Sequence, residues 1–159
     1  MQQQQTLTKT MLQFLTPKDP DIRLAQFSRE GDPDKVTALI IKHNANVNYI
    51  HYNGFSCLHW AAANGHAQVA QILLDHGAIV NQVNKDYMTP LHLAAISGHE
   101  SVIRVLVDRG ADIDARDDVN STPLHYAGQW GRDTVIQALL SRGADVHAKE
   151  DTGLTPLHL

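Results

Sequence analysis

A tetrapeptide, Thr-Pro-Leu-His, returns in this chain at a constant interval. It begins at Thr89, at Thr122 and at Thr155, and each occurrence follows the previous one by 33 residues. Ser56 occupies the preceding place in the series, where cysteine follows instead of proline. A fixed period of this length is typical of stacked supersecondary units, in which each unit buries its apolar face against its neighbours. We therefore expect a solenoid, and not a domain built around one central core.

Each period contains the signals of two short helices and a projecting loop. Thr89 and Thr122 are favourable N-caps, and the proline that follows each of them suits the first helical turn. Turn-forming residues such as those from Asn84 to Tyr87 precede the next unit and predict a hairpin-like finger. Glycines that suit a positive φ follow the first helix and then the second, at Gly65, Gly98 and Gly131 and at Gly77, Gly110 and Gly143.

Helix-turn-helix units of this length, with Thr-Pro-Leu-His at the start and Gly-Ala after the second helix, resemble ankyrin repeats. The resemblance implies an all-α fold, an ankyrin-repeat solenoid of helix-turn-helix units with hairpin-like fingers, over residues 21–159. Cys57, Tyr87, Asn120 and Gly128 depart from the family pattern and leave the geometry of the fingers open. The expected divisions are an N-terminal capping unit at 21–53, full repeats at 54–86, 87–119 and 120–152, and a truncated repeat at 153–159.

Both ends of the chain differ from the regular units. Residues 1–20 form a predicted N-terminal tail, in which an apolar stripe from Leu7 to Leu15 indicates a short amphipathic helix that covers the end of the stack. In the capping unit, Asp32 and Pro33 begin the second helix, and Asn44 replaces the closing glycine. At Leu159 the chain stops inside a first helix. We therefore expect either a longer protein or self-association through this uncovered end.

Composition argues against several classes of function. The net charge of -4 gives no reason to expect nucleic acid or an anionic membrane as a partner. No apolar run approaches the ~20 residues of a membrane span, and Gln2 to Gln5 stand where a secretory signal would carry basic residues, so we expect no such signal. The single cysteine, Cys57, suits a reducing compartment. A cytoplasmic location is expected, and a nuclear location or export by a signal-independent route stays open.

Histidines and Cys57 are the candidate chemical groups. The family resemblance implies that the histidine of each unit hydrogen-bonds to backbone near its helix start and in the adjacent finger. Neighbouring helices pack roughly 10 Å apart, whereas zinc ligands lie ~2 Å from the ion, so this series cannot share one metal. Cys57 takes a position that proline fills in other units, which predicts a packing role. Hydrolase and phosphate-loop motifs are also lacking. We expect no catalytic residue, cofactor, metal or small-molecule substrate.

The remaining candidate site is the concave surface formed by the fingers and first helices. Residues that differ between units in this region should select the partner. Tyr, Trp and Met are frequent in interface cores, and the apolar members of the set predict a stripe across successive units. Trp60 is expected to pack in the core instead. The predicted partner-binding residues are Tyr52, Asn53, Phe55, Lys85, Asp86, Tyr87, Met88, Ile96, Ser97, Asp118, Ser121, Gln129 and Trp130.

These observations favour a non-catalytic module that binds another protein across its concave face. The alternative is a targeting or regulatory arm of a larger enzyme, channel or secreted bacterial effector, whose catalytic part lies beyond Leu159. Two stretches, 54–61 and 123–131, are also similar to the ankyrin domain of the integrin-linked kinase family. That narrower resemblance implies a zinc-finger (LIM) adaptor as the partner, bound on the concave face near Trp130.

Overall fold

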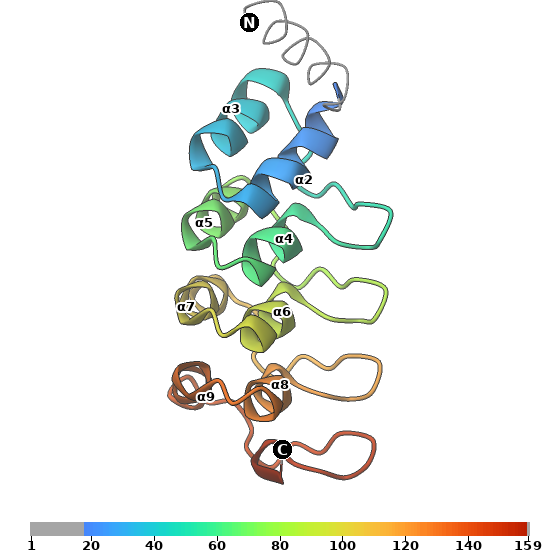
Figure 1. Cartoon of the computed structure of the whole chain (residues 1–159), viewed down its shortest axis with the longest axis vertical. Helices are drawn as coiled ribbons and strands as arrows, with labels where there is room; N and C mark the ends of the chain where they lie inside the picture. The colour runs from blue at the N-terminus through green and yellow to red at the C-terminus, as the bar shows by residue number, and fades with distance from the viewer. Residues whose placement is uncertain (1–17, 159) are drawn as a thin grey trace, which may run out of the picture.

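The computed structural model describes residues 18–158, which form a single stack of helix pairs (Figure 1). The prediction of an all-α solenoid is confirmed. The short helix expected around residues 7–15 lies outside the described residues. The elements are α2 (Pro20–Glu30) and α3 (Pro33–His43), α4 (Cys57–Ala63) and α5 (Ala67–Asp75), α6 (Pro90–Ser97) and α7 (Glu100–Asp108), α8 (Pro123–Gln129) and α9 (Asp133–Leu140), and the 3-10 turn η1 (Pro156–His158).

The helices form two parallel columns. The first helices α2, α4, α6 and α8 stack on one another and end at η1, while the second helices α3, α5, α7 and α9 form the other column (Figure 1). The loops project from the stack beside the first helices. We call the finger tips together with the exposed sides of the first helices the finger face.

The core runs along the whole stack because each unit contributes equivalent apolar side chains. Leucines from successive first helices and valines from successive second helices belong to one buried cluster, and both rows repeat at the period seen in the sequence except for a step one residue longer between Leu24 and Leu58. Small alanines such as Ala62 and Ala95 are also fully buried in the first helices. The two rows comprise Leu24, Leu58, Leu91 and Leu124, and Val36, Val69, Val102 and Val135, all at most 2% exposed.

Helix boundaries follow the predicted capping residues. The Asp32 carboxylate accepts a hydrogen bond of 3.0 Å from the Lys35 N–H at the start of α3. Asn44, which ends α3, has a φ of 50°, the left-handed conformation that glycine adopts in later units. Tyr87 and Asn120 also keep a positive φ at the finger turn, at 58° and 59°. The departures from glycine therefore leave the finger geometry unchanged.

Asparagine side chains connect the bases of the first two fingers to the next unit. The Asn48 side chain accepts from the Ile79 N–H at 2.9 Å and donates to the Gly77 carbonyl at 3.1 Å. Asn81 makes the equivalent pair of contacts one unit later. These bonds satisfy loop backbone groups and hold the unit spacing constant. Along residues 18–158, no helix is both long and apolar enough to cross a bilayer.

Candidate interaction surface

Histidines tie the first helices α4, α6 and α8 to the following finger. The Nδ1 atom of His59 accepts from the Ser56 N–H at 3.1 Å, which leaves the proton on Nε2, and Nε2 donates to the Met88 carbonyl at 3.0 Å. His92 bonds the Ser121 carbonyl and His125 the Leu154 carbonyl in the same way, at 3.1 and 3.2 Å. The predicted backbone role of these histidines is confirmed. Among residues 18–158 no three His, Cys, Asp or Glu side chains form a group that could hold a metal ion.

Burial determines the protonation states of the histidines and the cysteine, which are the side chains that a catalytic mechanism would use. Desolvation lowers the pKa of His59 to about 4 and also lowers that of His92, so both rings are neutral near pH 7. Desolvation raises the pKa of the Cys57 thiol to about 12. A fully buried, protonated thiol is a poor nucleophile, so Cys57 has a packing role.

Short polar contacts stiffen the fingers and aim their tip residues outward. The Asn84 side-chain oxygen accepts from the Asp86 and Met88 N–H groups at 2.9 and 3.0 Å. Asp117 Oδ1 has the same role one unit later, while its Oδ2 accepts from the Tyr126 hydroxyl at 2.6 Å. The finger tips are therefore rigid platforms, which lowers the entropic cost of ordering them on a partner.

Most of the predicted partner-binding residues reach the surface. The side chains of Tyr52, Tyr87 and Trp130 are 84%, 61% and 55% exposed. The polar residues Lys85, Asp86, Asp118 and Gln129 are exposed as well. The partly buried members are Asn53, Phe55, Met88, Ile96 and Ser97.

Ser121 does not belong to the surface. It is 8% exposed, since its carbonyl accepts from His92 and its N–H donates to Asp117 Oδ1 at 2.8 Å. Its place in the finger is determined by these backbone contacts, which the sequence position alone did not reveal. We remove Ser121 from the candidate interaction residues.

The exposed aromatic residues lie at two edges of the finger face and do not form one row. Tyr52 and Tyr87 belong to finger tips, whereas Trp130 follows the last residue of α8, roughly 10 Å along that helix from its finger. Phe55, which the predicted stripe included, turns inward, and its ring centroid lies 4.9 Å from that of Trp60. The aromatic residues thus flank the face on both sides.

The comparison with known families matches the repeated geometry. A family model described as "Ankyrin repeats (3 copies)" matches residues 22–117 and 83–150, which overlap and together cover most of the chain. The chain belongs to the ankyrin-repeat family. Ankyrin repeats are generally protein–protein interaction modules and are typically non-catalytic. A search of curated proteins found no significant match, so the narrower similarity to the integrin-linked kinase family stays an expectation from the residues.

Between the first two ankyrin-repeat units the structure reveals a pocket that the sequence analysis missed. It has a volume of about 200 Å³ and lies between α2, α4 and the first finger. The Arg29 guanidinium carbon lies 5.8 Å from the centre of the Trp60 ring. Arg29 aligns with Ile96 and Gln129, both of which were in the predicted set, so the alignment of units contained a signal for it. The lining residues are Ile22, Ala25, Gln26, Arg29, His51 and Trp60.

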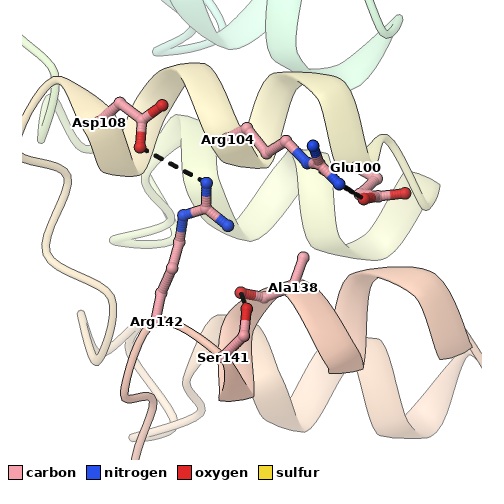
Figure 2. Close-up of polar contacts among 6 residues, drawn as sticks. All are labelled: Glu100, Arg104, Asp108, Ala138, Ser141 and Arg142. Carbon is pink, nitrogen blue, oxygen red and sulfur yellow. Dashed lines mark hydrogen bonds and ion pairs between the residues drawn. The ribbon is translucent and has the colours of Figure 1, made fainter.

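The second-helix side of the ankyrin repeats presents a polar depression of about 280 Å³ between α7 and α9. Figure 2 shows that its arginines already have carboxylate partners. Arg104 donates to Glu100 at 3.1 Å, and Arg142 lies 3.5 Å from Asp108. Because these pairs are solvent-exposed and each charge is compensated, this side is a weaker candidate for partner binding than the finger face.

Proposed function

We propose that this ankyrin-repeat chain is a non-catalytic protein-interaction module whose partner docks on the finger face. The observation that carries the proposal is the exposure of Tyr52, Tyr87 and Trp130, each more than half accessible to solvent on a rigid backbone. Trp and Tyr are the residues most enriched among interface hot spots, because they bury a large area and lose little side-chain entropy.

The backbone at Tyr87 also supports a functional role. Its φ of 58° is a conformation that bulky L-residues rarely adopt, and the equivalent position of the first finger is Gly54. A residue that holds an unfavourable conformation while its side chain faces solvent contributes little to folding. A tyrosine at this position is explained if its ring contacts a partner.

Charged and polar residues complete the face around the aromatic ones. Lys85, Asp86 and Asp118 on the fingers and Gln129 on α8 are exposed beside them. Protein interfaces combine aromatic anchor residues with polar residues that set the register and exclude wrong partners. The chemistry of the face therefore fits a folded or extended protein segment.

The test is alanine substitution at the two strongest anchors. We expect Trp130→Ala and Tyr87→Ala each to weaken partner binding by roughly 2–4 kcal/mol. The measurement is calorimetric titration of a partner isolated by affinity capture on the intact chain. Ile41→Ala is the matched control, because Ile41 is 66% exposed but belongs to α3 in the other helix column.

The thermal midpoint of each variant establishes that the stack remains folded. Unchanged affinity in both aromatic variants would refute the finger face as the docking surface. So would a loss in Ile41→Ala as large as the loss in Trp130→Ala.

A further inference from the structure

The pocket between α2, α4 and the first finger lies at the N-terminal end of the finger face. Four of its lining residues come from α2, and His51 and Trp60 come from the next finger and first helix. Its volume of about 200 Å³ is large enough for a single side chain. Most of the lining is apolar, and Arg29 is the only lining residue with a permanent charge.

Contacts with neighbouring residues hold the walls of the pocket in place. The His66 ring donates through Nε2 to the Arg29 carbonyl at 3.0 Å, which fixes the end of α2 against the next unit. The Trp60 ring packs against Phe55, with the two centroids 4.9 Å apart. The Nδ1 atom of His51 lies 3.2 Å from Asn53 Oδ1, which orients the imidazole. The pocket is therefore formed before any ligand arrives, and this reduces the entropic cost of binding.

Arg29, like Arg23 on the same helix, lies over an aromatic ring and differs in this from the arginines of the regular units. Its guanidinium carbon lies 5.8 Å from the Trp60 centroid, a cation–π arrangement that leaves the in-plane N–H groups free. Within residues 18–158 the Arg29 guanidinium has neither a hydrogen bond nor an ion pair. The arginines that do donate to carboxylate or carbonyl oxygens are Arg104, Arg109, Arg116, Arg132 and Arg142.

We propose that this pocket binds a glutamate or aspartate side chain of the partner. The carboxylate occupies the free donors of Arg29, and the methylene stem lies against Trp60 and Ile22. Paired N–H donors in a planar fork match the two oxygens of a carboxylate, and such charge-assisted bonds are roughly twice as strong as neutral ones. This inference rests on the proposed function in one respect, because the side chain belongs to a partner on the finger face.

The experiment is an NMR titration of the whole chain with capped tripeptides. The probe is acetyl-Leu-Glu-Leu-amide, and acetyl-Leu-Gln-Leu-amide is its neutral match. The reporter is the indole N–H signal of Trp60, distinguished from that of Trp130 by a Trp130→Phe variant. We expect the glutamate peptide to shift this signal saturably and to bind about five-fold more tightly than the glutamine peptide.

Two arginine variants distinguish binding of the glutamate side chain in the pocket from a general electrostatic attraction of the peptide to the protein. Arg29→Met keeps most of the aliphatic stem, so we expect it to retain the fold and lose the preference for glutamate. Arg104→Met on α7 removes the same charge from the opposite side and should leave the preference unchanged.

Several results would overturn the assignment. One is equal binding of the two peptides, and another is a preference that survives in Arg29→Met. Failure of the glutamate peptide to shift the Trp60 signal, or tighter binding of acetyl-Leu-Phe-Leu-amide, would do the same. Tighter binding of Leu-Gln-Leu with a free terminal carboxylate would also reject a side-chain ligand.

The peptide titration requires no natural partner, so its outcome is independent of the alanine test at Trp130 and Tyr87. If the peptides show no preference for glutamate while the alanine variants weaken partner binding, the proposal of a carboxylate pocket is wrong and the docking face stands. If the peptides show the preference while both alanine variants bind the partner unchanged, the docking face is wrong and the pocket stands.

Discussion

Among residues 18–158, three non-glycine residues adopt the left-handed backbone conformation, and they are not equivalent. Asn44 and Asn120, with φ of 50° and 59°, belong to the residue type that tolerates this region best outside glycine. Tyr87 has the same backbone at 58° but lacks a short polar side chain that can bond to local backbone. At the scale of single residues, the backbone conformation of Tyr87 therefore costs folding stability while its side chain remains accessible to a partner.

Replacing Tyr87 with glycine should stabilise the chain. Relief of the left-handed strain exceeds the added flexibility of glycine in the unfolded state, so we expect Tyr87→Gly to raise the free energy of unfolding by about 0.5–1 kcal/mol. Urea denaturation measures this, and Asn44→Gly should change the same quantity by no more than a few tenths. A Tyr87→Gly variant less stable than the parent would contradict the strain argument.

At the scale of elements, one histidine in each of α4, α6 and α8 performs two structural tasks. In α6, the Nδ1 of His92 accepts from the Thr89 N–H at 3.1 Å and so completes the N-terminal cap. Its Nε2 reaches the Ser121 carbonyl in the next finger. A helix start and a loop 29 residues away are thus joined through a single buried ring.

Removal of His92 should separate these two elements. We expect His92→Ala to lower the free energy of unfolding by about 2–4 kcal/mol, because it leaves a cavity, leaves the buried Thr89 N–H without a partner and removes one of the two hydrogen bonds that the Ser121 carbonyl accepts. His158 is the matched control, since it pairs with Thr155 in the same way but is exposed. His158→Ala should cost about 1 kcal/mol or less. Equal losses in the two variants, measured by chemical denaturation, would rule out the proposed role of the finger contact.

At the scale of the whole molecule, the stack is a sum of contacts between neighbouring units, and two of its buried histidines, His59 and His92, respond to pH in the same direction. The folded pKa of His59 is about 4 and that of His92 is also lowered, while an unfolded histidine titrates near its ordinary value of 6.5. The unfolded chain therefore binds protons first as pH falls. The stability that these rings contribute is fully present above pH 6.5 and declines below it.

Acid should therefore destabilise the stack in a defined window. We expect the free energy of unfolding to fall between about pH 6.5 and pH 4, with His59 alone accounting for about 3 kcal/mol. Urea midpoints at several pH values measure the effect. A His43→Ala variant, which lacks an exposed histidine of α3, should show the same profile as the parent. A midpoint that stays constant across this window would contradict the assignment.

The sequence by itself determined the period and the helix ends, and its resemblance to ankyrin repeats implied the role of the histidines. Capping at Thr122, left-handed closure at Asn44 and the packing role of Cys57 all depend on residues a few positions apart or on comparison of one unit with the next. Such local preferences act before the chain is folded. For this reason the all-α ankyrin-repeat solenoid was predictable.

Only the tertiary structure decided which side chains of the finger face are available to a partner. Ser121 is buried where its carbonyl accepts from His92. The Phe55 ring packs against Trp60, and the Arg29 guanidinium lies over the same Trp60 ring across the boundary of two units. Each of these outcomes depends on distances between side chains of successive units. Exposure and pocket shape arise when units pack against one another, because the atoms that cover or frame a side chain are distant from it along the chain.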